Sequence, residues 1–222
     1  MERRSFGIYE DQFTGSEVEG FIRCLGGEQP IRGGKRNLLD SPEVVPVIHS
    51  APVRSLVEKF LSADAVCVRG ILFDKTQESN WNLPFHQDTK IAVKRSVNAP
   101  GYAQFSEKDG VVHCCPPAEV LERQIALRIQ LDACPLEAGP VRVIEGSDAS
   151  GVLNQDEITE VVSTSQPVAC TGGIGSILVF RSLVLHGSDR STSLSRRRVL
   201  HLEFCDAKLE TPVEWKWAIS LA

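Results

Sequence analysis

The stretch around which this chain is organised reads Trp81-Asn82-Leu83-Pro84-Phe85-His86-Gln87-Asp88. In an extended segment, side chains two residues apart lie on the same face, so we expect His86 and Asp88 to point the same way. An imidazole and a carboxylate side by side are two of the three ligands of a 2-His-1-carboxylate site. Such a site holds non-heme Fe(II) by one face and leaves the other coordination positions open. The hypothesis requires a second histidine further along the chain.

The composition is that of a folded globular domain. Hydrophobic residues make up 42% of the 222 residues and charged residues 24%, close to the averages for such domains, which excludes global disorder. The net charge of −5 offers no attraction to phosphate backbones, and the basic cluster 196–198 is too short for a nucleic-acid footprint. We expect no nucleic-acid partner.

The amino-terminal residues and the cysteines indicate a reducing compartment. Residues 1–11 contain no apolar stretch, and no apolar run in the chain is long enough to span a bilayer. We therefore expect a cytoplasmic protein with no membrane partner. The seven cysteines form no C-x-x-C motif, which favours reduced thiols over a disulfide framework. Five of them are interpreted as small buried apolar groups: Cys24, Cys67, Cys134, Cys170 and Cys205.

Helical patterns occur mainly in the first part of the chain, and a further short helix is predicted over residues 154–162. Thr14 and Glu17 have capping-box spacing, which predicts a helix over residues 15–25. Apolar residues at i, i+3, i+4, i+7 and i+8 from Val53 predict an amphipathic helix that ends near Ser62.

Short segments rich in β-formers follow, and they predict seven or eight strands. These segments are 65–73, 81–93, 125–131, 140–144, 167–170, 176–180, 183–188 and 197–204. The five-residue turn 135–139 favours a hairpin between two of them, and a tight turn is expected between the strands over 167–170 and 176–180. Residues 98–117 are expected to be a long loop, which is either a lid or binding loop or a mobile surface insertion.

Helices followed by many strands predict an α+β chain, mainly β, whose body is a sandwich or barrel of the jelly-roll type. The sequence contains no internal repeat or linker, so we expect a single domain over residues 1–222. Its parts are a helical flank of about 1–64, a barrel of about 65–205 and a C-terminal tail over 206–222.

His186 is the candidate for the second histidine. It ends an apolar strand, directly before Gly187, where it can lean over the mouth of a barrel. The other interpretation is a structural histidine, which is the commoner role for one histidine after an apolar run.

Arg197 lies on the polar face of the last strand together with His201 and Glu203, while Leu200 and Leu202 share the opposite face. Its guanidinium is suited to a bidentate clamp on a carboxylate. In the alternative interpretation, the basic residues 196–198 are solvated charges at the start of a strand.

Taken in order, four segments of the sequence resemble the phytanoyl-CoA dioxygenase family. These segments are Asn82–Asp88, Ala138–Ser147, Leu185–Ser188 and Arg197–Leu200. The resemblance covers residues 65–205 approximately. It implies a double-stranded β-helix, which is a jelly-roll or cupin-like barrel, and an oxygenase that depends on Fe(II) and on 2-oxoglutarate as cosubstrate.

The resemblance also implies the roles of particular residues. His86, Asp88 and His186 would be the metal ligands and catalytic centre. Arg197 would bind the distal carboxylate of 2-oxoglutarate, with Ser188 as a hydrogen-bonding helper. Relatives that halogenate lack the carboxylate ligand, so the presence of Asp88 favours hydroxylation.

We therefore expect a dioxygenase that hydroxylates a small organic molecule with release of succinate and CO2, its partners being that substrate and O2. Candidate pocket residues are Gln87, Phe105 and His113. The alternative is a non-catalytic jelly-roll protein that binds a metal or a small molecule, since fold does not imply function. A structural Zn(II) site is disfavoured because such sites usually close four ligands and only three are evident.

Overall fold

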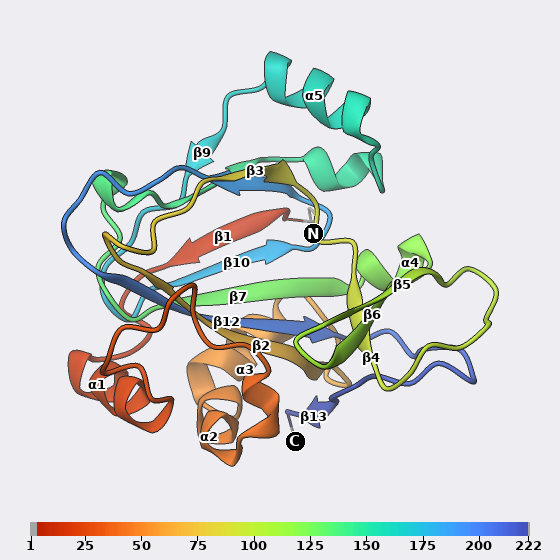
Figure 1. Cartoon of the computed structure of the whole chain (residues 1–222), viewed down its shortest axis with the longest axis horizontal. Coiled ribbons are helices and arrows are strands. Elements are labelled where there is room, and N and C mark those ends of the chain that lie inside the picture. The colour runs from red at the N-terminus through yellow and green to blue at the C-terminus, as the bar shows by residue number, and fades with distance from the viewer. Residues whose placement is uncertain (1–3, 222) are drawn as a thin grey trace.

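The computed structural model of the protein describes residues 4–221 as a body of antiparallel β-sheets, with the amino-terminal helices packed on one side and the helix over residues 155–164 on the opposite side (Figure 1). The helices are α1 (Gly15–Cys24), α2 (Val45–Ile48), α3 (Ala51–Glu58), α4 (Ala118–Leu121) and α5 (Gln155–Thr164). The strands are β1 (Phe6–Tyr9), β2 (Val66–Lys75), β3 (Leu83–His86), β4 (Ile91–Val93), β5 (Ala103–Lys108), β6 (Val111–Cys115), β7 (Gln124–Gln130), β8 (Val141–Ile144), β9 (Val168–Ala169), β10 (Ile177–Arg181), β11 (Leu185–Ser188), β12 (Arg197–Cys205) and β13 (Ile219–Ser220).

Two sheets form the jelly roll. The larger has the strand order β1-β10-β7-β12-β2-β13, and the smaller has the order β3-β11-β8-β9. Neighbouring strands are mostly not consecutive in sequence, which is typical of this fold. A third sheet, β4-β6-β5, lies at one end of the larger sheet (Figure 1). The predicted fold class is confirmed.

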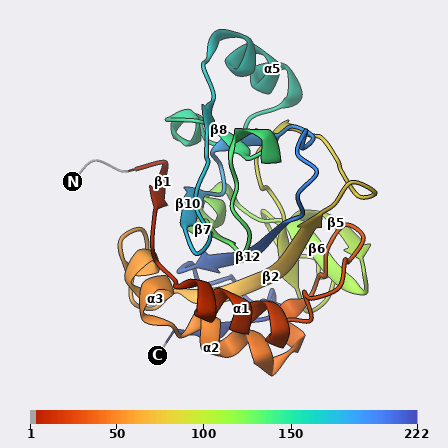
Figure 2. The ribbon, with the colours of Figure 1, turned by 90° about the vertical axis from the view of Figure 1, so that its left-hand side faces the viewer.

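The outer face of the larger sheet is covered by α1, α2 and α3 (Figure 2). Leu200, Leu202 and Phe204 of β12 are fully buried in the same apolar cluster as Val18 of α1 and Val53 of α3. Side chains alternate along a strand, so the other face of β12 turns Arg197, His201 and Glu203 towards the inside of the barrel. The apolar face thus fixes which polar residues look inward.

The predicted hairpin between residues 125–131 and 140–144 is wrong. β7 pairs with β10 and β12 in the larger sheet, whereas β8 pairs with β11 and β9 in the smaller one. The chain crosses between the two sheets at a point where local turn residues resemble those of a hairpin. The tight turn expected before residue 176 is present, because the N–H of Ser176 donates to the carbonyl oxygen of Gly173 at 3.2 Å, and the strands that it joins, β9 and β10, belong to different sheets.

The long loop expected over residues 98–117 is also wrong, because most of it forms the β5–β6 hairpin. The missed signal is Asp109-Gly110, whose φ values of 53° and 74° are those of a two-residue type I′ turn. Lys108 and Val111 are paired directly across this turn.

The predicted helices are present, with boundaries that differ from the predicted ones by no more than four residues. Thr14 and Glu17 form the expected capping box of α1. The helix predicted from Val53 to Ser62 is α3, which begins at Ala51 and ends at Glu58. Of the five cysteines expected to be buried, four are, but Cys24 is exposed. Within residues 4–221, no helix is long and apolar enough to cross a membrane.

Candidate metal centre

His86 and His186 face each other across two neighbouring strands. His86 ends β3, His186 is the second residue of β11, and the two are direct register partners. Their ring centroids are 4.3 Å apart. A direct cross-strand pair places both side chains on the same face of the sheet, so the imidazoles enter the barrel together.

Asp88 joins them although it lies outside the strand. The predicted strand over 81–93 is interrupted here, because β3 and β4 belong to different sheets. The backbone N–H of Asp88 donates to the carbonyl oxygen of Ser182 at 2.9 Å, which fixes the turn between the sheets. The Asp88 carboxylate oxygens lie 3.8 Å from His86 Nε2 and 3.5 Å from His186 Nε2. The ligand atoms of the three residues all lie within 4.8 Å of one another.

Backbone carbonyls hold both histidines in the form that binds metals. His86 Nδ1 lies 2.9 Å from the carbonyl oxygen of Pro84, and His186 Nδ1 lies 3.0 Å from that of Val184. Because a carbonyl oxygen only accepts, each Nδ1 must carry the proton, which leaves the Nε2 lone pairs directed at the space beside Asp88. This is the arrangement found around metal-ligating histidines.

Electrostatics at the three side chains also suit a cation. Burial lowers the pKa of His186 to about 4, against the opposing attraction of Asp88, so the imidazole is neutral at neutral pH. Burial acts to raise the pKa of Asp88, but the neighbouring His186, His201 and His86 together lower it below its usual value. Two imidazoles and one carboxylate therefore converge, the donor set that non-heme Fe(II) takes.

A second group, Asp88 with His201 and Glu203, also has its ligand atoms within 4.8 Å of one another. The Glu203 carboxylate already has hydrogen-bond partners in the protein, however. It accepts from Arg69 Nη1 at 3.2 Å and Gln124 Nε2 at 3.0 Å, and His201 Nε2 lies 3.1 Å away. The first group is the better metal site, because among residues 4–221 the Nε2 atoms of His86 and His186 have no partner other than Asp88 of the same group.

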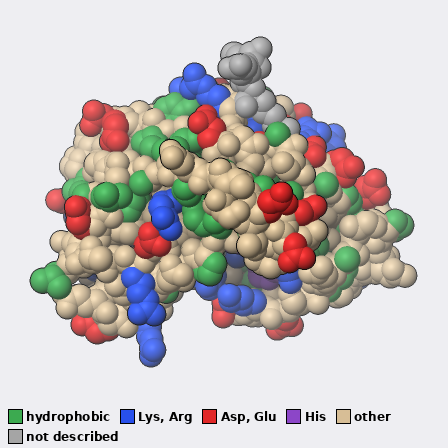
Figure 3. Space-filling view, turned by 90° about the horizontal axis from the view of Figure 1, so that it is seen from above, with side chains coloured by type: hydrophobic (Ala, Val, Ile, Leu, Met, Phe, Trp, Pro, Cys, Tyr) green, Lys and Arg blue, Asp and Glu red, His purple; other side chains and the backbone are tan. Residues whose placement is uncertain are grey.

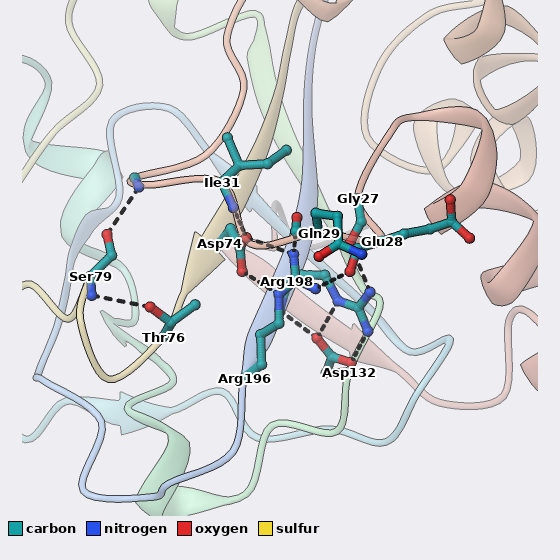
Figure 4. Close-up of polar contacts among 11 residues, drawn as sticks. Gly27, Glu28, Gln29, Ile31, Asp74, Thr76, Ser79, Asp132, Arg196 and Arg198 are labelled. Atoms are coloured by element: carbon teal, nitrogen blue, oxygen red, sulfur yellow. Dashed lines mark hydrogen bonds and ion pairs between the residues drawn. The ribbon is translucent and has the colours of Figure 1, made fainter.

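The three consecutive arginines are separated by the alternation of side chains along an extended segment. Arg196 pairs with Asp74 at 2.7 Å and Arg198 with Asp132 at 2.6 Å (Figure 4). Arg197 points the other way and is 4% exposed. Its Nη1 lies 3.9 Å from Cys134 Sγ, and its Nε has no hydrogen-bond partner in the part of the chain that the structure describes. A buried guanidinium with so few partners is suited to binding an anion.

The three proposed ligands and Arg197 line one cavity of about 430 Å³, which we call the metal chamber. It contains all five residues singled out from the sequence: His86, Asp88, His186, Ser188 and Arg197. A larger groove of about 1120 Å³ lies between α4 and the C-terminal tail and contains none of them. The chemistry therefore belongs to the smaller cavity.

The three candidate pocket residues lie elsewhere. Gln87 is buried and points away from the chamber, where its Nε2 donates to the carbonyl oxygens of Leu183 and Gly151. Phe105 packs in the apolar cluster between the third sheet and the tail. His113 lines an adjoining cavity of about 340 Å³ that shares Asp88 with the chamber.

Sequence reasoning missed the other basic residues of the chamber, which include Arg69 and Arg128. Arg128 is buried, its Nη1 lies 3.2 Å from His201 Nδ1, and its Nε has no partner. A signal for them was present in the sequence. Arg69 lies within the apolar run 66–73 of β2 and Arg128 lies between Leu127 and Ile129 of β7, and a charge within a buried run needs a specific reason.

The model of the phytanoyl-CoA dioxygenase family matches residues 25–199, which is most of the chain. The chain belongs to this family. The predicted family and enzyme class, an Fe(II)- and 2-oxoglutarate-dependent dioxygenase, are thereby confirmed. No curated protein sequence matches the chain.

Solved structures similar to this family member have the same fold. AviO1 from Streptomyces viridochromogenes Tue57 is 19% identical, with 92% of this chain and 90% of that chain covered and a TM-score of 0.64. EctD from S. alaskensis with 2-oxoglutarate and 5-hydroxyectoine is 16% identical, with 91% and 72% covered and a TM-score of 0.68. HygX from Streptomyces hygroscopicus with iron bound is 16% identical, with 91% and 83% covered and a TM-score of 0.64. Two of these neighbours thus carry the predicted cofactors.

Proposed function

We propose that this protein hydroxylates a small organic molecule at a site formed by His86, Asp88 and His186, using Fe(II), 2-oxoglutarate and O2. One oxygen atom enters the substrate as a hydroxyl group. The other enters succinate as 2-oxoglutarate loses CO2.

The observation that supports the proposal most directly is the convergence of the three ligand atoms within 4.8 Å. Two come from a cross-strand pair and the third from the turn that follows β3. All three lie in a chamber large enough for small ligands, whose size range begins at about 300 Å³.

Bound Fe(II) would supply the redox chemistry that activates dioxygen. The residues of the chain would do the rest. The two Nε2 atoms and one Asp88 oxygen would occupy one face of the ion and leave the opposite face for cosubstrate and dioxygen. The carbonyl oxygens of Pro84 and Val184 would keep both rings in place by accepting from Nδ1. Retention of the Asp88 carboxylate favours hydroxylation over halogenation, because no coordination position is freed for a halide.

Arg197 would bind the distal carboxylate of 2-oxoglutarate. It is buried at 4% exposure within the same chamber, and a guanidinium with an unpartnered Nε matches a carboxylate in charge and shape. Ser188, buried on β11 next to the metal-facing strand pair, would donate its hydroxyl to the same carboxylate.

The test is anaerobic addition of Fe(II) and 2-oxoglutarate, followed by visible absorption spectroscopy. We expect a metal-to-ligand charge-transfer band in the native protein and its loss in His86→Ala. Asp88→Ala should abolish formation of succinate when O2 is admitted. A native spectrum that stays flat after both additions would refute the proposal.

His113→Ala is the matched control. His113 is half-buried, and its Nδ1 lies 3.0 Å from the carbonyl oxygen of Val111, two residues earlier, as in both proposed ligands. It lies outside the three-residue group, so the band should persist in this variant.

A further inference from the structure

We propose that the substrate is a small organic acid, and that Lys108 and Arg69 bind its carboxylate or phosphate group at the edge of the metal chamber. This inference names the substrate class of the proposed dioxygenase and rests on that function.

The chamber carries an excess of positive charge. Its lining includes five basic side chains: Arg36, Arg69, Lys108, Arg128 and Arg197. The acidic side chains in the same lining are Asp88 and Glu203, and Arg36 is paired with Asp109 outside it, which leaves two positive charges uncompensated. The charges of Fe(II) and of the 2-oxoglutarate dianion cancel each other, so the excess of positive charge persists when both are bound. In a protein of net charge −5, such a concentration of basic groups favours an anionic ligand.

The basic residues fall into two groups. Arg128 and Arg197 lie deep in the chamber, and both are less than 9% exposed. Arg69 and Lys108 lie at its edge, because both also line the adjoining cavity that contains Asp88 and His113. A molecule positioned at the metal ligand Asp88 from that side meets Arg69 and Lys108. In the space-filling view, histidine atoms are visible in a recess with Lys and Arg side chains beside it (Figure 3).

Lys108 is available for a ligand. Among residues 4–221, its ammonium group forms no hydrogen bond or ion pair with the protein. Arg69 uses Nη1 to hold Glu203 and is partly exposed to the cavity. Arg69 and Lys108 line the same two cavities, so a guanidinium and an ammonium at one site can share the oxygens of one carboxylate or phosphate.

Neighbouring residues fix Lys108 in position. It is the last residue of β5, and the turn that follows is anchored at Asp109. The carbonyl oxygen of Asp109 accepts from Asn37 Nδ2 at 3.0 Å, and its carboxylate pairs with Arg36 Nε at 3.2 Å. The hairpin tip is therefore held against the loop before residue 38. The backbone of Lys108 is therefore fixed where it lines both cavities, which keeps its ammonium group within reach of a ligand there while the side chain is free to turn towards it.

The test measures binding of matched compounds to the full chain loaded with Zn(II), which supports binding without turnover, and saturated with 2-oxoglutarate to block Arg197. The probes are hexanoate with hexanamide and hexylamine, phenylacetate with phenylacetamide and phenethylamine, and hexyl phosphate with hexanol. Ligand-observed NMR gives the dissociation constants. We expect at least one acid to bind about tenfold or more tightly than its neutral and cationic counterparts, as charge-assisted hydrogen bonds would produce.

Three variants locate the site. Lys108→Glu should weaken binding of that acid by about tenfold or more, and Lys108→Arg should restore most of it. Lys208→Glu, which changes an exposed lysine of the C-terminal tail outside the chamber, should leave the affinity unchanged. Equal binding of acid and amide, no binding of any acid, or no effect of Lys108→Glu would each overturn the inference.

The outcome is separate from that of the proposed function. Failure of the dioxygenase proposal appears as a missing charge-transfer band and no succinate, in experiments without any of these probes. Acid binding that is lost in Lys108→Glu would support the anion site even then, whereas a normal band with amide-selective binding would reject only the anion site.

Discussion

His86 and His186 are direct cross-strand partners, and their rings lie 4.3 Å apart although a hundred positions separate them in sequence. The ladder between β3 and β11 fixes this pairing. A shift of one residue would turn one imidazole to the opposite face, so the proposed site depends on the register as much as on the residues.

The pairing predicts the effect of removing one imidazole. His186→Ala leaves only His86 and Asp88, so the affinity for Fe(II) should fall by more than the tenfold to hundredfold typical of losing a supporting contact. Calorimetry with Mn(II) or anaerobic titration with Fe(II) measures it. His113→Ala should bind metal like the native protein, and a similar loss in that variant would contradict the assignment.

Gly187 lets the two strands approach. A Cβ at this position would lie 2.9 Å from the carbonyl oxygen of Leu83 and 3.1 Å from the backbone N of Phe85, both in β3. Gly187→Ala should therefore push β3 away and separate His86 from His186. We expect a loss of metal affinity of about tenfold or more in a protein that remains folded, because the displacement is local.

Gly20→Ala provides the comparison for that variant. Gly20 lies within α1, and a Cβ there meets no atom within 4 Å. This substitution should raise the free energy of unfolding by about 0.5–1 kcal/mol through helix propensity and leave metal binding unchanged. Equal metal affinity in both glycine variants would show that the β3–β11 spacing is irrelevant to the site.

Arg197 and Arg198 should give opposite phenotypes. Arg197→Gln removes the proposed clamp and should weaken 2-oxoglutarate binding by about 2–5 kcal/mol, and Arg197→Lys should recover only part of this, because an ammonium lacks the planar fork. Binding is followed through the charge-transfer band.

Arg198→Gln removes the partly buried pair with Asp132 instead. The free energy of unfolding should fall by about 1–3 kcal/mol while the affinity for 2-oxoglutarate stays within about twofold. If Arg198→Gln weakened 2-oxoglutarate and Arg197→Gln did not, the clamp would have been assigned to the wrong arginine.

Much of the site could be predicted because its residues sit in local patterns. The spacing of His86 and Asp88 is visible within one short segment, and the alternation of β12 is visible within another. The partners of each strand could not be predicted in this way, because the pairing of β7 with β10 and β12 depends on contacts between segments that are distant in sequence. For the same reason, the basic residues that join Arg197 from β2, β5 and β7 could be assembled only in the folded chain.

Lys75 offers a pH-dependent signature of the charged chamber. Its side chain is 1% exposed, and Nζ donates to the carbonyl oxygen of Asp189 at 2.7 Å. Burial, followed by the charges of Arg197 and Arg128, lowers its pKa to about 8, compared with about 10.4 for lysine in an unfolded chain.

The sign of the effect follows from proton counts. Below pH 8 both states hold the proton, and above about pH 10.4 neither does. Between these values the unfolded state binds more protons, so the Lys75 contribution makes the free energy of unfolding rise with pH. Lys75→Met lacks this contribution. Chemical denaturation of both proteins from pH 7 to 10.5 should therefore give a difference, native minus variant, that increases across the window. Saturating 2-oxoglutarate should shift the increase to higher pH, because a dianion beside Arg197 raises the pKa of Lys75, whereas parallel profiles would exclude a depressed pKa at this lysine.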